Sequence, residues 1–280
     1  MKRGLSEGRG LKALVLAAAA AGFAGTSAQA QDCGRSATGF TEWLNGFKHV
    51  AVLDGVSPGV VDAALSGLSY DAAVKAHDGG AAAFGHVFAR FAASHITPGG
   101  VARGKALLRS YAATLAKIEE RYGVPGPVLV AIWGLETGFG SDNGSYPTFT
   151  ALATLAWDCR RPERFRAELI DALMMVQRGV VQQSPRQLKG AWAGEIGQTQ
   201  LMPSAVLMFA TTPDGPGAVD LIHNSADALA STANFLQAHG WQRGAGWDEG
   251  EPNFAALLEW NSAQIYAKTV ALFADRLAGR

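Results

Sequence analysis

The chain has 280 residues, of which 48% are hydrophobic, and its 24 Lys and Arg residues are balanced by 24 Asp and Glu residues. This length and apolar content allow one large domain or two modest domains with a substantial core. The zero net charge supplies no overall positive field, which argues against nucleic acid or an anionic membrane surface as the main partner.

Residues 1–30 have the pattern of a secretory signal peptide. Lys2 and Arg3 begin a basic segment, residues 13–24 form a short apolar run, and Ala28-Gln29-Ala30 is a small-x-small cleavage pattern. An uncleaved anchor is the alternative, but the apolar run is shorter than the roughly 20 residues that a membrane-spanning helix needs. We therefore expect export of a mature chain that has no stable membrane anchor.

The two cysteines are Cys33 and Cys159. Because an exported chain folds in an oxidising compartment, a disulfide between them is favoured over two unpaired buried thiols. Two cysteines and scattered histidines do not indicate a metal site, and we expect no metal and no cofactor.

Helical periodicity dominates the mature chain. Apolar residues recur at helical spacing in residues 40–47 and 60–65, and residues 103–122 show the clearest amphipathic helix. Thr97-Pro-Gly-Gly100 interrupts the pattern before that helix. We predict a helical subdomain at 31–100 and a core at 101–280, although the two segments would equally fit one continuous domain.

The second half of the chain continues this pattern. Residues 128–136 predict an almost wholly apolar, buried helix that Gly138 and Gly140 end. Further helices are predicted at 163–177, from Pro203, at 226–238 and at 262–277. Three glycines among polar residues predict turns or a short sheet at 187–200, and residues 211–219 predict a loop. The fold class is therefore mainly α, with a minor β contribution.

Glu136 is the only acid between residues 124 and 141, and it lies at the end of the apolar helix. An apolar setting disfavours the charged form of a carboxyl group and raises its pKa, so the group can protonate a leaving oxygen near neutral pH. That chemistry cleaves glycosidic bonds. A solvent-exposed or Arg-paired glutamate is the alternative interpretation.

A glycosidase usually needs a second carboxylate, as a nucleophile or a base. The nearby acids Asp142, Asp158 and Glu195 resemble solvated surface residues more than buried ones. The lack of an evident second acid favours a mechanism in which the substrate supplies its own nucleophile.

Several sequence blocks, in order, resemble the membrane-bound lytic transglycosylase B family. They are YGVP (122–125), AIWGLETGFG (131–140), ALATLA (151–156), GAWAGEIGQTQLMPS (190–204), DALAS (227–231), HGW (239–241) and WN (260–261). The resemblance extends over roughly residues 36–278. It implies a lysozyme-like catalytic core in a peptidoglycan lytic transglycosylase of the periplasm.

The resemblance also implies residue roles. Glu136 matches the single acid/base that cleaves the bond between N-acetylmuramic acid and N-acetylglucosamine and leaves a 1,6-anhydromuramyl end. The substrate-binding positions implied are Gln200, Gln198, Arg160, Arg161, Asn261 and Trp260. The Arg pair would meet a carboxylate of the substrate, or be a solvated pair. Peptidoglycan glycan strands are the implied partner, and cell-wall synthesis proteins are candidate further partners.

Two departures from the family pattern are visible. Ala191 stands where a hydroxyl residue is common, and Gln198-Thr199-Gln200 stands where Tyr/Gln-Gly/x-Gln is usual. Some relatives also carry a calcium-binding loop at the place of residues 212–220, where this chain keeps Asp214 and Asp220 but lacks the run of oxygen ligands. We therefore expect no calcium site. A hydrolytic muramidase acting on the same bond, and an inactive peptidoglycan-binding scaffold, remain the alternative functions.

Overall fold

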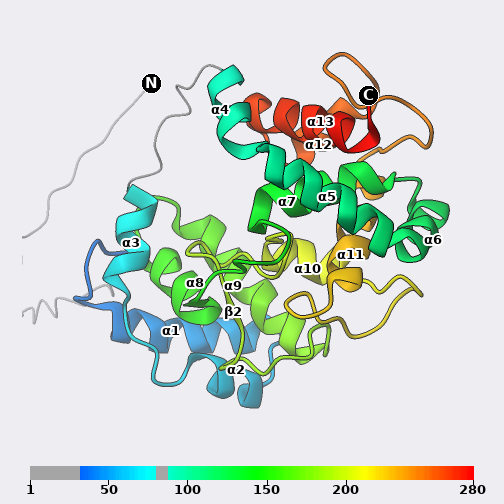
Figure 1. The fold of residues 1–280 in the computed structure, drawn as a ribbon. Coiled ribbons are helices and arrows are strands. Elements are labelled where there is room, and N and C mark those ends of the chain that lie inside the picture. Colours follow the sequence, from blue (N-terminus) through cyan, green and yellow to red (C-terminus); the bar gives the residue numbers. More distant parts are fainter. Residues whose placement is uncertain (1–31, 80–87) are drawn as a thin grey trace, which may run out of the picture. The chain divides into compact units, whose positions relative to one another are not determined.

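The computed structural model describes residues 32–79 and 88–280, which belong to one compact unit, Gln31–Arg280. The predicted signal peptide at 1–30 lies outside the described residues. Helices dominate, as expected (Figure 1). The elements are α1 (Phe40–Leu53), α2 (Pro58–Leu65), α3 (Ala72–Gly79), α4 (Phe88–His95), α5 (Pro98–Ser110), α6 (Ala112–Tyr122), α7 (Gly126–Thr137), β1 (Tyr146–Pro147), α8 (Thr148–Trp157), α9 (Pro162–Gln177), β2 (Lys189–Gly190), α10 (Pro203–Phe209), α11 (Ser225–Ala238), α12 (Phe254–Trp260) and α13 (Gln264–Ala278).

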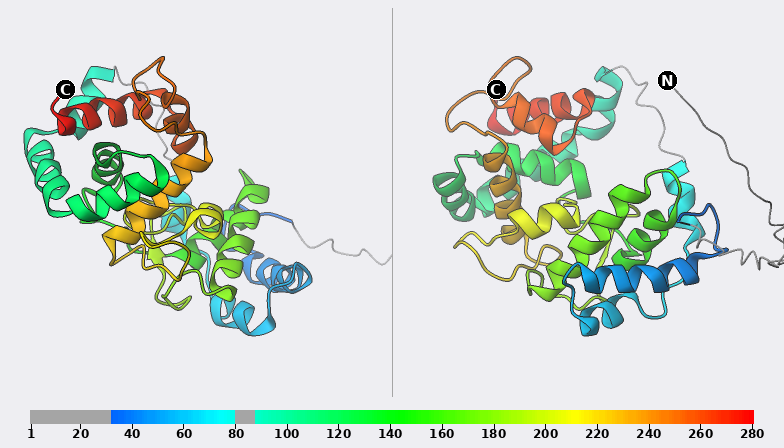
Figure 2. Two further views of the ribbon diagram at one scale, coloured as in Figure 1. Left: turned by 90° about the vertical axis from the view of Figure 1, so that its right-hand side faces the viewer. Right: turned by 180° about the vertical axis from the view of Figure 1, so that it is seen from behind.

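The buried apolar side chains form two clusters. One cluster joins residues 40–74 to residues 149–228, and in it α8 packs on α9 and α9 packs on α10. The other joins residues 92–139 to residues 229–277, with α7 packed on α13 (Figure 2). Each cluster contains residues from before and after residue 100. The predicted boundary at residue 100 therefore does not separate the two clusters.

Most predicted helices are present, but the helix expected at 103–122 differs. Helix α5 already begins at Pro98, because Thr97 caps it: the Thr97 Oγ1 accepts a hydrogen bond of 3.0 Å from Gly100 N. The helix ends at Ser110, and α6 begins after Tyr111, whose ring packs edge-on against Trp133. The Thr97-Pro98-Gly99-Gly100 segment is thus a helix start and not a domain linker.

The segment 187–200, predicted to hold turns or a short sheet, contains strand β2, which pairs antiparallel with β1. Tyr146 pairs with Gly190 and Pro147 with Lys189, and the chain after β2 turns back so that Ala191 N donates to Glu195 O at 3.0 Å. An added Cβ at Gly190 would lie 1.8 Å from Glu195 O. Glycine is therefore required where this turn closes on itself.

Cys33 and Cys159 form the predicted disulfide, with their Cα atoms 5.0 Å apart. The segment beside Cys33 is also held by the backbone, since Gly34 N donates to Trp157 O at 2.8 Å and Cys159 N donates to Gly34 O at 3.2 Å. The disulfide thus attaches the start of the described chain to the end of α8.

Candidate active site

Helix α7 carries Glu136 in its last turn. Pro127 lies in the first turn of this helix, and Gly138 ends it in the left-handed conformation, with φ of 57°. An added Cβ at Gly134 would come within 2.8 Å of ring carbons of Phe139 and Phe273. This glycine lets α7 pack closely against α13, and the close packing fixes the position of Glu136 at the end of α7.

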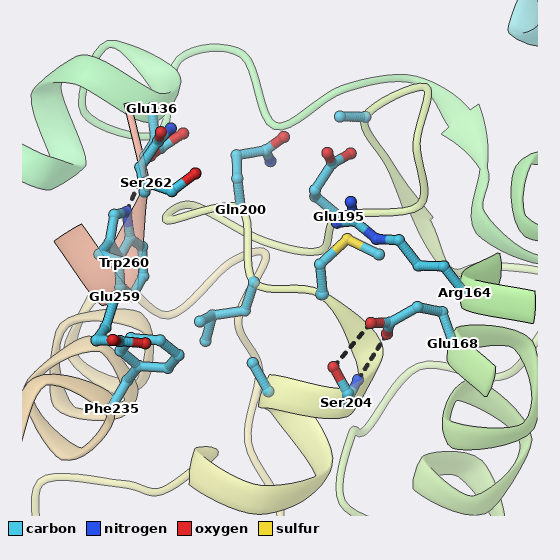
Figure 3. A pocket seen from close by; sticks show the side chains of 15 residues that line it. Glu136, Arg164, Glu168, Glu195, Gln200, Ser204, Phe235, Glu259, Trp260 and Ser262 are labelled. Atoms are coloured by element: carbon cyan, nitrogen blue, oxygen red, sulfur yellow. Dashed lines mark hydrogen bonds between the residues drawn. The ribbon is translucent and has the colours of Figure 1, made fainter. Parts of the chain in front are cut away.

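The Glu136 carboxylate accepts two hydrogen bonds on the same oxygen. Tyr266 Oη donates to Glu136 Oε1 at 2.5 Å. Trp260 Nε1 donates to the same oxygen at 3.1 Å (Figure 3). Burial raises the pKa of Glu136; the two hydrogen bonds oppose that increase, and the negative charge of Glu195 adds to it. The result is an oriented carboxyl group whose pKa lies above its ordinary value.

Glu136 lies in a cleft of about 570 Å³ where the two apolar clusters meet. One wall of the cleft comes from α7, α11, α12 and residues 261–262, which follow α12. The opposite wall comes from α9, the turn after β2 and α10 (Figure 3). The lining residues are Glu136, Phe235, Glu259, Trp260, Asn261 and Ser262 on the first wall, and Arg164, Glu168, Ala191, Glu195, Gln200, Leu201, Met202, Ser204 and Ala205 on the second.

Three predicted substrate-binding residues lie in this cleft. Trp260 and Asn261 line it beside Glu136, and Gln200 lines it from the opposite wall. The Gln200 backbone is in the left-handed region, with φ of 57°, and its Nε2 donates to Gly197 O at 2.7 Å. A non-glycine residue in this conformation is strained, which is common at functional sites.

The other three predicted substrate-binding residues do not line the cleft. Gln198 is 5% exposed, and its side chain is bound within the protein, donating to Ile222 O at 3.0 Å and accepting from Ser225 Oγ at 2.9 Å. Arg160 and Arg161 both pair with Asp78 of α3, whose side chain is 1% exposed. In the structure, these three residues hold segments of the protein together.

The candidate second acids differ from one another. Asp142 is exposed, and its Oδ1 accepts from Gly144 N at 3.1 Å, whereas Asp158 is buried and paired with Lys75. Glu195 lines the cleft, and burial raises its pKa. The interpretation of Glu195 as a solvated surface acid is therefore wrong, because the turn after β2 directs this side chain inward.

The sequence pattern did not single out Tyr266 or Glu168. Tyr266 shares an apolar face of α13 with Val270 and Phe273, so periodicity assigns it to the core, and only its hydroxyl reaches Glu136. Glu168 accepts hydrogen bonds from Ser204 N at 3.0 Å and Ser204 Oγ at 2.9 Å, which fixes the start of α10 in the cleft wall. Both contacts join segments that are far apart in the sequence, so no local sequence pattern predicts these contacts.

The loop with Asp214 and Asp220 shows no grouped ligands. Asp214 pairs with Lys117, and Asp220 Oδ2 lies 3.0 Å from His223 Nδ1. Within residues 32–79 and 88–280, no three His, Cys, Asp or Glu side chains are grouped so that they could hold a metal ion.

We expect a Tyr266→Phe variant to lose about tenfold in kcat, because a hydrogen bond to a charged group is lost and Glu136 is no longer oriented. That hydrogen bond opposes the burial effect on Glu136. Its removal therefore raises the pKa of Glu136 further, and the decline of activity at alkaline pH should move to higher pH. The pH profile of kcat measures both effects.

The matched control is Tyr122→Phe, which removes a buried hydroxyl whose nearest partner is Thr211 Oγ1 at 3.4 Å, outside the cleft. Its pH profile should match that of the unmodified chain. An unshifted profile for Tyr266→Phe would contradict the role given to the Tyr266 hydroxyl.

Comparisons with known proteins agree with this geometry. The family model described as the transglycosylase SLT domain matches residues 39–250. Membrane-bound lytic murein transglycosylase B of Escherichia coli K12 is 37% identical over 156 residues, which are 55% of this chain and 42% of that protein. The chain thus matches less than half the length of this relative.

Solved structures share the fold. SltB3 of Pseudomonas aeruginosa, in complex with NAG-anhNAM-pentapeptide, has a TM-score of 0.80 and 29% identity, over 86% of this chain and 80% of that chain. The lytic transglycosylase Slt35 of Escherichia coli, in complex with bulgecin A, has a TM-score of 0.73 and 26% identity, over 84% and 92%. These matches confirm the predicted mainly helical, lysozyme-like fold class. None of the helices in residues 32–79 and 88–280 is long and apolar enough to cross a bilayer.

Proposed function

The chain belongs to the transglycosylase SLT domain family, and from this premise we propose that it cleaves peptidoglycan glycan strands as a lytic transglycosylase. The observation that carries the proposal is the half-buried Glu136 carboxyl, oriented by Tyr266 and Trp260 in a cleft of about 570 Å³. The similarity to SltB3, whose structure was solved with NAG-anhNAM-pentapeptide, supports a glycan with an anhydromuramyl end as the product class.

In the proposed mechanism Glu136 acts twice. As an acid, its raised pKa lets it hold a proton, which it gives to the glycosidic oxygen while the bond from that oxygen to the anomeric carbon breaks. As a carboxylate, it then takes the proton of the muramyl 6-hydroxyl, whose oxygen bonds to the anomeric carbon. No water is consumed, and the product carries a 1,6-anhydro ring.

The other cleft residues would bind the glycan. Gln200 faces Glu136 from the opposite wall, Asn261 follows Trp260, and the Trp260 ring packs edge-on against Phe235 with centroids 5.1 Å apart. Rings held in this way offer an apolar surface beside amide groups, an arrangement that suits the mixed faces of a sugar. The effect on glycan binding would be indirect for Arg160, Arg161 and Gln198, because these residues hold segments of the protein in place and do not line the cleft.

The setting proposed is the periplasm, which agrees with the signal peptide expected from the sequence and with the disulfide of the structure. Cell-wall synthesis proteins stay a predicted class of partner.

The proposal is tested with the mature chain, residues 31–280, and purified insoluble peptidoglycan. We expect the turbidity of the suspension to fall as soluble fragments are released, and we expect chitin, which lacks muramic acid, not to yield anhydro products. Binding to peptidoglycan without release of fragments would instead identify an inactive scaffold.

A further inference from the structure

Glu195 is a second carboxylate of the cleft, half-buried, and the proposed mechanism does not use it. Its Oε2 is buried and makes no hydrogen bond, and none of the ion pairs in the described part of the chain involves this residue. A buried charge without a counter-ion is costly to a fold. Groups of this kind need an explanation, and a functional role is one of the few available.

The backbone holds Glu195 in place. The turn after β2 is closed by Ala191 N donating to Glu195 O, and the backbone N–H groups of Ala193 and Glu195 face the carboxylate. Gly194 completes the turn with φ of 93°. The turn fixes the backbone of Glu195, and the facing N–H groups orient its carboxylate.

Glu195 forms no ion pair with any cation in the described part of the chain. Glu168 is bound to Ser204, and Arg164 is exposed and lies over the Phe165 ring, 5.6 Å from its centroid. The positive charge of Arg164 opposes the effect of burial on the pKa of Glu195. The titratable or charged groups in and around this cleft are Glu136 from α7, Arg164 and Glu168 from α9, Glu195 from the turn after β2, Glu259 from α12 and Tyr266 from α13.

We propose that Glu195 is a positioning residue for the reaction. Its negative charge keeps the proton on Glu136 until the leaving oxygen takes that proton. The same charge stabilises the positive charge that develops at the anomeric carbon. The inference rests on the proposed function, since it assigns Glu195 a part in the same reaction. In this role Glu195 acts through its charge, which the buried and unpartnered Oε2 atom leaves uncompensated by any hydrogen bond at that atom. The electrostatic effect of Glu195 on Glu136, which raises the pKa of Glu136, agrees with this role.

The test is a Glu195→Gln variant, which keeps the shape of the side chain and removes its charge. We expect kcat on peptidoglycan to fall about tenfold and the alkaline decline of activity to move to lower pH by about one unit. This direction is opposite to that expected for Tyr266→Phe. The melting temperature at neutral pH should not fall, because burial raises the pKa of Glu195 and its charged form costs stability there.

Glu119→Gln is the matched control, since Glu119 is an exposed residue of α6 outside the cleft. An unchanged kcat and pH profile for Glu195→Gln would overturn the inference. A lower kcat with an unshifted pH profile and a lower melting temperature would also overturn it, since Glu195 would then be structural. Release of fragments by the unmodified chain, but not by Glu136→Gln, shows that the proposed function stands whichever result Glu195→Gln gives.

Discussion

Replacing Glu136 by Gln is expected to reduce turnover on peptidoglycan by about 10³-fold or more, because an amide can neither give a proton to the glycosidic oxygen nor take one from the attacking hydroxyl. The two donors that orient Glu136, Tyr266 Oη and Trp260 Nε1, would still find an acceptor in the Gln Oε1. Cleft geometry and glycan binding should therefore remain. Release of soluble fragments measures the rate, and co-sedimentation with insoluble peptidoglycan measures the binding.

The same variant should not be less stable at neutral pH. The pKa of Glu136 is raised above its ordinary value in the folded chain, so its charged form costs stability at any pH above that folded pKa. The cost disappears below the pKa of the unfolded chain, where the group is protonated in both states. The gain from Glu136→Gln should therefore be largest near neutral pH and shrink in acid, as thermal melts across pH would show. A fully active Glu136→Gln variant would place the catalytic acid elsewhere.

Removing the disulfide with Cys33→Ser and Cys159→Ser together is expected to destabilise the fold strongly. The bond closes a loop with a sequence separation of 126 residues. Restricting the unfolded chain over a loop of that size stabilises the folded state by about 5 kcal/mol in the chain-entropy model. For a chain of this length the melting temperature should fall by roughly 10 °C.

The unmodified chain treated with reductant serves as the comparison. Its melting temperature should fall to that of the double variant, and the double variant should be insensitive to reductant. The cleft residues lie away from the disulfide, so the rate of fragment release well below the melting temperature should change little. An unchanged melting temperature would mean that the backbone hydrogen bonds of Gly34 hold the segment without the disulfide.

The sequence predicts the helices best where one face is apolar. Helices α9, α11 and α13 lie close to their expected bounds, and α7 is recognisable because a wholly apolar run ends at glycines. Helix α8 was not predicted, because nearly every side chain in Thr148–Trp157 is buried and such a helix has no polar face to show its period. The break at Tyr111 depends on the contact of its ring with Trp133, which is a tertiary contact.

The candidate site was predicted in part. Glu136 is visible as a lone acid in an apolar helix, and the family resemblance supplies Gln200, Trp260 and Asn261, all of which the structure brings to one cleft. The resemblance does not show that Arg160 and Arg161 pair with Asp78. The roles of Tyr266 and Glu195 depend on how α13 and the turn after β2 face α7, and such placements are set by packing between distant segments.

The most direct test of the proposed function is mass spectrometry of the muropeptides that residues 31–280 release from purified peptidoglycan. Intramolecular attack by the 6-hydroxyl predicts fragments lighter by one water than the corresponding reducing muropeptides, and none of them should be reducible by borohydride. Fragments of full hydrated mass with reducing ends would contradict the account. They would show hydrolysis, in which water and not the substrate is the nucleophile, and a base for that water would have to be found in the cleft.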